Sequence, residues 1–251
     1  MEQRLDVLAI GAHPDDVELM CGGTLARLSA QGYRTGILSL TQGEMGSRGS
    51  REQRKFEAQQ AARILDVAWH GMLDIPDSNV AVNEENKLKV IAEIRRHRPD
   101  LVFAPPQRSR HPDHVNCSQL VREAVFFAGL RRLETDAPHF RPQRLAYYME
   151  MVDFVPNFIV DISSTFEKKM ASIQAYTSQF YQPGKEDREE PTFISSPEFY
   201  QSIISKAEYW GQKVGVRYGE PFEVAEPIGV DDPVNLLCHK RQTKEERQAL
   251  D

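Results

Sequence analysis

Short apolar runs alternate along the chain with longer stretches in which apolar residues recur every three or four positions. The runs are typical of buried strands, and the recurrence is typical of helices with one buried face. The apolar runs predict strands at residues 7–10, 34–40, 67–72, 101–104, 146–149 and 158–161. The helical spacing predicts helices at residues 17–31, 50–65, 84–98, 115–129, 164–180 and 197–214.

This alternation of strands and helices indicates a parallel α/β sheet with right-handed crossovers. We expect a Rossmann-like sheet flanked by helices, with the strand order 3-2-1-4-5. At 251 residues the chain is expected to form a single domain with its core at about residues 1–162. Residues 163–251 change to a pattern of helices and loops, including a loop at 182–191 and a charged tail from residue 239. We interpret them as a C-terminal cap on the core.

Charge and cysteine content narrow the class of protein. The net charge of −6 argues against nucleic-acid binding, which needs cations to neutralise phosphates. The three cysteines form no C-x-x-C pair, so neither a disulfide framework nor a thiolate zinc site is indicated. The chain starts without a signal-peptide pattern, and no apolar run approaches the roughly 18 residues of a membrane span. We therefore expect a cytoplasmic protein that binds neither nucleic acid nor membrane.

Two similar polar motifs follow predicted strands. His13-Pro14-Asp15-Asp16 comes after the first strand, and His111-Pro112-Asp113-His114 comes after the fourth. In the order 3-2-1-4-5 these two strands are neighbours, and ligands bind in the crevice at their carboxyl ends. Although about 100 positions apart, the motifs are expected to meet there. A single such motif is more typical of a helix cap with a structural histidine, but two of them favour a functional site.

Buried imidazoles and carboxylates carry a large desolvation cost unless a cation joins them. Two histidines and one carboxylate, with one open position, are a known catalytic zinc set. Adjacent residues at a helix start diverge by about 100°, so Asp15 and Asp16 cannot both face one ion in the same way. We predict His13, Asp16 and His114 as ligands of Zn²⁺, a set that also accepts Fe²⁺ and other divalent transition metals.

In that arrangement Asp15 is left beside the water that the ion activates and is the predicted general base. His111, one turn before His114, can polarise the substrate carbonyl or protonate the leaving amine. The alternative of a dinucleotide site is rejected, because Gly11 alone precedes the helix and two aspartates would repel a pyrophosphate. The glycine-rich segment 41–50 is interpreted either as a flexible connection or as a substrate loop.

The motifs AHPDDVE at residues 12–18 and HPDH at residues 111–114 closely resemble the LmbE-like (PIG-L) family of zinc-dependent N-acetylglucosamine deacetylases, over nearly the whole chain. Residues 41–49 and 218–222 resemble the bacillithiol-pathway branch. The resemblance implies hydrolysis of an acetamide on glucosamine, with N-acetylglucosaminyl malate as the substrate of that branch. It also implies the zinc ligands, base and oxyanion-binding histidine that are predicted above.

The resemblance further implies substrate contacts. Arg54 matches a sugar-binding arginine, and Arg110 matches a substrate-facing one. Glu44 and Arg48 of the glycine-rich loop are expected to contact substrate as well. The cations Arg48 and Arg110 would suit the two malate carboxylates. Arg51 and Arg108 are interpreted as surface residues. A tyrosine that some relatives use falls at Phe199, next to Tyr200.

Two further readings of the family stay open. The substrate could be another amino-sugar or thiol-sugar conjugate, or the protein could bind sugar without catalysis. The resemblance also implies a homo-oligomer, often a hexamer.

Overall fold

The structure, a computed structural model, describes residues 4–184 and 190–238. Within these ranges one seven-stranded sheet has the order β3-β2-β1-β4-β5-β7-β6. The strands are β1 (Val7–Gly11), β2 (Thr35–Ser39), β3 (Trp69–Met72), β4 (Leu101–Ala104), β5 (Arg144–Tyr148), β6 (Phe158–Asp161) and β7 (Gly219–Val224). The helices are α1 (Asp16–Ala30), α2 (Arg51–Ile64), α3 (Glu84–His97), α4 (Pro112–Ala128), α5 (Phe166–Gln174), α6 (Pro197–Lys213) and α7 (Pro233–Leu237), with a 3₁₀ turn η1 (Phe193–Ser195).

The central strands are parallel, so the two motifs that follow β1 and β4 leave the sheet at the same edge. Val7 of β1 lies opposite Thr35 of β2 on one side and opposite Leu101 of β4 on the other. Every residue of β1 is buried, as expected for a central strand that is covered on both faces. The carboxyl ends of β1 and β4 are therefore side by side, and this confirms the predicted strand order through β5.

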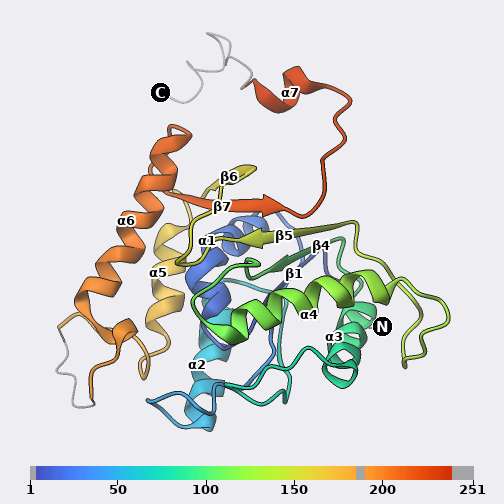
Figure 1. Cartoon of the computed structure of the whole chain (residues 1–251). Helices are drawn as coiled ribbons and strands as arrows, with labels where there is room; N and C mark the ends of the chain where they lie inside the picture. Colours follow the sequence, from blue (N-terminus) through green and yellow to red (C-terminus); the bar gives the residue numbers. More distant parts are fainter. Residues whose placement is uncertain (1–3, 185–189, 239–251) are drawn as a thin grey trace.

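Helices cover both faces of the sheet (Figure 1). One apolar cluster joins the sheet to α3 and α4 through side chains such as Ile91 and Leu120. A second joins the other face to α1 through Val17 and Leu25. A third, around Ile173, packs α2, α5 and α6 together. The fold is thus a three-layer α/β sandwich.

The prediction that residues 163–251 form only a cap was wrong in one respect. Residues 219–224 form β7, which lies between β5 and β6 and is antiparallel to both. The sequence of this strand hides it, because Glu220 is charged and Pro221 cannot donate a ladder hydrogen bond. The C-terminal part of the chain therefore completes the sheet as well as covering it.

Several predicted element ends also differ. Helix α4 starts at Pro112, three residues before the predicted start, because His111 caps it by accepting the Asp113 amide on Nδ1 at 3.2 Å. Helix α5 ends at Gln174 and not at residue 180. Part of the predicted loop at 182–191 and the predicted tail from residue 239 lie outside the described residues. No helix in the described ranges has the length and apolar character needed to cross a membrane.

Segment 226–238, including α7, extends away from the body of the molecule (Figure 1). It exposes apolar side chains, among them Ile228, Val234 and Leu237. The homo-oligomer that the family resemblance implies stays a prediction.

Helix α1 is interrupted at Cys21, whose φ of −138° is not helical. The interruption frees the backbone N–H groups of Gly23 and Thr24, and both donate to the Glu220 carboxylate, at 3.1 and 2.7 Å. Lys169 of α5 pairs with the same carboxylate, and both side chains are almost fully buried. Glu220 therefore acts as an N-terminal cap for the second half of α1, and Lys169 balances its charge.

Removing the Lys169 ammonium should leave the Glu220 charge buried without a partner. We expect Lys169→Met to lower the free energy of unfolding by about 3–5 kcal/mol in urea titrations. The matched control is Lys89→Met, which breaks contacts to Asp74 and Glu85 on the surface. That change should cost no more than about 1 kcal/mol. Equal losses in the two variants would show that the buried pair is not what holds α1.

Candidate active site

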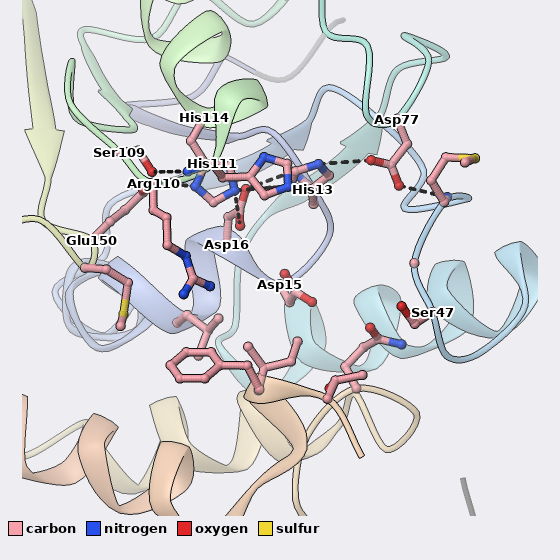
Figure 2. A pocket seen from close by; sticks show the side chains of 18 of the residues that line it. His13, Asp15, Asp16, Ser47, Asp77, Ser109, Arg110, His111, His114 and Glu150 are labelled. Atoms are coloured by element: carbon pink, nitrogen blue, oxygen red, sulfur yellow. Dashed lines mark hydrogen bonds and ion pairs between the residues drawn. The ribbon is translucent and has the colours of Figure 1, made fainter. Parts of the chain in front are cut away.

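A cavity of about 330 Å³ lies at the carboxyl edge of the sheet. Figure 2 shows His13, His111 and His114 gathered on one side of it, with Asp16 among them and Asp15 farther along the wall. The histidines and aspartates come from the segments after β1 and β4, as predicted from the strand order. Apolar side chains from α1, η1, α6 and the segment after β5 also line the cavity. They include Leu19, Met20, Met151, Phe193, Ile194 and Phe199.

Three side chains, His13, Asp16 and His114, bring polar atoms close to one another in this cavity. His13 Nδ1 lies 3.2 Å from His114 Nε2, and His114 Nε2 lies 3.3 Å from Asp16 Oδ1. His13 Nδ1 lies 3.7 Å from Asp16 Oδ2. Tetrahedral bonds of about 2.0–2.1 Å hold ligand atoms about 3.3 Å apart, so the spacing fits a zinc-like ion.

The far nitrogen of each imidazole faces carboxylates. His13 Nε2 lies 3.1 Å from Asp77 Oδ1 and 3.3 Å from Asp113 Oδ2. His114 Nδ1 forms an ion pair with Glu150, whose Oε1 is 2.9 Å away without aligned hydrogen-bond geometry. Carboxylates behind ligating histidines fix the ring orientation and direct the inner nitrogen to a metal. This second contact is typical of histidines that bind metal.

The charges of the site also fit a cation. Burial alone would lower the pKa of His13, but Asp113, Asp16 and Asp77 outweigh it and raise that pKa well above its usual value. Burial likewise opposes the charged form of His114, yet Asp16 and Glu150 raise its pKa to about 10. The surrounding carboxylates thus favour positive charge on both rings. A divalent ion would provide that charge in place of the two protons.

His111 is a further candidate ligand, because one nitrogen of each of His13, His111 and His114 lies within 4.8 Å of the others. Its ring stacks on His114 with centroids 4.8 Å apart. Its Nδ1 accepts the Asp113 amide, so the neutral ring carries its proton on Nε2. Burial and the neighbouring histidines lower the pKa of His111, which keeps the ring neutral. His111 is therefore set up as a hydrogen-bond donor in the cavity.

Asp15 has an unusual backbone and a buried carboxylate. Its φ of 107° is in the region that side chains rarely adopt. Arg54 stabilises this turn, since its Nη2 donates to the Pro14 carbonyl at 2.6 Å and to Asp15 Oδ2 at 3.0 Å. Burial raises the pKa of Asp15 to about 7, although the Arg54 charge acts in the opposite direction. A carboxylate in this state is suited to accept a proton near neutral pH.

The predicted substrate residues divide into two groups. Arg48 and Arg110 line the cavity, and the Arg110 guanidinium lies 4.9 Å from the ring centroid of Phe193. Arg54 lines it too, but its guanidinium is bonded to Asp15, Pro14 and Gln179. Glu44 is exposed outside the cavity lining, and its carboxylate accepts the amides of Gln42 and Asp77.

The tyrosine that some relatives use is replaced at the cavity wall. Phe199 lines the cavity, whereas the Tyr200 hydroxyl accepts a hydrogen bond from Gln174 Nε2 at 3.3 Å. The described structure therefore brings an apolar ring to this position.

Sequence reasoning missed Asp77, Glu150 and Gln179. Asp77 follows β3 and Glu150 follows β5, so each stands at the same edge as the two histidine motifs. The rule that located those motifs could have located these carboxylates as well. Gln179, which bonds Arg54 from a turn after α5, has no such signal.

Metal content can distinguish the two ligand sets. If His13, Asp16 and His114 hold the ion, Asp16→Ala and His114→Ala should lose most of the bound zinc after dialysis, whereas His111→Ala should retain it. Elemental analysis of the purified variants measures this. Loss of zinc in His111→Ala with retention in Asp16→Ala would assign the ion to the three histidines.

Comparisons with known proteins show the family to which this chain is similar. A family model described as PIG-L, GlcNAc-PI de-N-acetylase, matches residues 8–125, which include both histidine motifs. A diacetylchitobiose deacetylase of Thermococcus kodakarensis is 31% identical over 85% of this chain and 80% of that protein. A probable N-acetyl-alpha-D-glucosaminyl L-malate deacetylase 2 of Bacillus cereus is 26% identical over 69% of this chain and 83% of that protein.

The solved structure of the conserved protein TT1542 from Thermus thermophilus has a TM-score of 0.82 to this fold. It is 42% identical, over 90% of this chain and 97% of that one. The two proteins are thus similar in both sequence and fold across most of their lengths. The chain belongs to the PIG-L (LmbE-like) family, and the similar proteins include deacetylases of N-acetylated sugar conjugates.

Proposed function

We propose that this protein is a zinc-dependent deacetylase that hydrolyses the N-acetyl group of an N-acetylglucosaminyl conjugate, most specifically N-acetylglucosaminyl malate. One observation carries the proposal. His13, Asp16 and His114 bring polar atoms close to one another, with the buried Asp15 carboxylate and the His111 ring at the same cavity. Amide hydrolysis needs these parts together: a cation site, a base and an oxyanion donor.

His13, Asp16 and His114 would hold the ion. A bound divalent ion supplies Lewis acidity, which polarises a carbonyl and lowers the pKa of water. The protein contributes the orientation of these ligands through Asp77, Asp113 and Glu150. It also contributes the low-dielectric cavity in which such interactions are strong.

Asp15 is the general base in this proposal. Its carboxylate accepts the proton of the attacking water and later returns a proton to the leaving amine. The buried Arg54 guanidinium holds the carboxylate in place. Its charge also favours the ionised form of Asp15, so that a proton acceptor is available.

His111 is the oxyanion donor. Because its Nδ1 accepts the Asp113 amide, its Nε2–H is free to donate toward the acetyl oxygen as negative charge develops there. A preorganised donor of this kind stabilises the transition state more than the ground state.

The cavity walls favour an amphipathic, anionic substrate. The apolar side chains can accept the faces of a sugar ring, and Arg48 and Arg110 lie at the same cavity. Guanidinium groups bind carboxylates through paired hydrogen bonds. The two malate carboxylates supply such partners, which supports the malate conjugate over an uncharged amino sugar.

The Asp15 carboxylate can be tested by a change that keeps its shape. Asp15→Asn should retain bound zinc but lose acetate release by about 10²–10⁴-fold, because the amide cannot accept the proton. Asp74→Asn provides the matched control, since Asp74 is an exposed carboxylate outside the cavity lining. Zinc content and kcat are measured together. An Asp15→Asn variant with near-normal kcat would refute the assignment of the base.

The substrate class can be tested with a pair of acetamides. We expect N-acetylglucosaminyl malate to be hydrolysed with a kcat/KM at least about tenfold above that of N-acetylglucosamine, because a hydrogen bond to a charged group contributes about 1.5–3 kcal/mol. Arg110→Gln should narrow this ratio. Arg108→Gln, on the same loop but outside the cavity lining, should leave it unchanged. Equal rates on the two substrates would favour another amino-sugar conjugate, and zinc-independent sugar binding without turnover would favour a non-catalytic protein.

A further inference from the structure

Two carboxylates face one nitrogen of a candidate metal ligand. Asp77 Oδ1 and Asp113 Oδ2 lie 3.1 and 3.3 Å from His13 Nε2. A single imidazole N–H needs only one acceptor, and each carboxylate is nearly buried, with 6% and 4% of its side chain exposed. Burying the second carboxylate costs free energy unless that carboxylate also makes other hydrogen bonds.

Asp113 has a local role. It stands in the first turn of α4, and its Oδ1 accepts the Val80 amide at 3.2 Å. Its contacts connect His13 to α4 and to residue 80, and it does not line the cavity. Asp113 therefore supports the ring from the scaffold side.

Asp77 has contacts of a different kind. Its Oδ2 accepts the Met45 amide at 2.9 Å, and its own amide donates to Glu44 Oε1 at 2.9 Å. Both partners belong to the glycine-rich loop after β2. Residues 45–48 of that loop line the cavity, as Asp77 does. Figure 2 shows Asp77 between His13 on one side and this loop on the other.

We propose that Asp77 is a positioning residue that couples the cavity loop at residues 44–48 to the metal ligand His13. One carboxylate oxygen orients His13 and the other holds the loop, so order in either partner favours order in the other. The proposal rests on the ligand role of His13 described under the proposed function. When Nδ1 is a ligand, the ring proton must be on Nε2, where it faces Asp77.

Coupling of this kind is reciprocal, so zinc binding should order the loop. We expect zinc to slow hydrogen–deuterium exchange in the peptide that contains Met45. Asp77→Asn keeps an acceptor for the Met45 amide but removes the anionic partner of His13. This variant should bind zinc about 10–100-fold more weakly, and at saturating zinc its loop should no longer respond to the metal.

Two variants separate the coupling from its parts. Asp113→Asn removes the other anionic partner of His13, so it should weaken zinc binding similarly while the loop still responds to saturating zinc. Glu44→Ala removes the acceptor of the Asp77 amide and loosens the loop, so exchange should be faster with and without zinc. Because the coupling is reciprocal, this variant should also bind zinc more weakly, though by less than Asp77→Asn, since the Asp77 carboxylate still faces His13. Should Asp77→Asn fail to fold, Asp77→Ser makes the same test with a smaller neutral side chain.

A zinc-dependent slowing in Asp77→Asn equal to that of the unmodified protein would overturn the proposal. Loss of the slowing in Asp113→Asn as well would also overturn it, because the effect would then belong to His13 and not to Asp77. Neither measurement uses a substrate. A protein that shows the coupling but hydrolyses no acetylated sugar would contradict the proposed function and leave the role of Asp77 intact.

Discussion

Buried negative charge at one edge of the sheet is the constraint on which the site depends. Asp15, Asp16 and Asp113 are almost wholly removed from water, as is Glu150. Carboxylates in such a place either bind protons or require nearby positive charge. The protein meets the requirement with imidazoles whose pKa values are raised, and with the Arg54 guanidinium. The same arrangement also fits a cation, because an ion can take the place of the imidazole protons.

Two glycines of the glycine-rich loop, Gly43 and Gly46, are explained by the Arg54 side chain. A Cβ atom on Gly43 would lie 2.9 Å from Arg54 Cζ, and one on Gly46 would lie 2.8 Å from Arg54 Nη1. Gly43 also has a φ of +68°, which disfavours any larger residue. The loop can therefore lie directly on the guanidinium and exclude water from its contact with Asp15. These two glycines therefore follow from the place of the guanidinium that holds Asp15, whereas Gly49 lies against Ser178.

The meeting of the two histidine motifs was predictable from the sequence because it follows from sheet topology. The alternation of strands and helices favoured a doubly wound sheet of order 3-2-1-4-5, in which β1 and β4 are neighbours, and neighbouring parallel strands end at one edge. The roles of Arg54 and Glu44 were less accessible, because they depend on the path of loops. Arg54 joins Gln179, 125 positions away, through a turn that no periodicity describes. Strand β7 was missed for a related reason. Its buried Glu220 binds the backbone amides at the interruption of α1, and this long-range contact leaves no periodic pattern in the sequence.

The C-terminal part of the chain supports the proposed catalytic site by positioning its residues. Lys206 of α6 donates to the Glu150 carbonyl, and Glu150 in turn faces His114. Tyr176 donates to the buried Glu18 carboxylate at 2.8 Å, within the same first turns of α1 that carry Asp15 and Asp16. Glu220 accepts the backbone amides of Gly23 and Thr24 that the interruption at Cys21 frees, so it holds α1 just beyond those turns. An Asp15 carboxylate held in a strained turn needs such support on every side, because a small rotation of α1 would remove it from the attacking water. The geometry of the base is therefore a property of the whole chain and not of the motif that contains it.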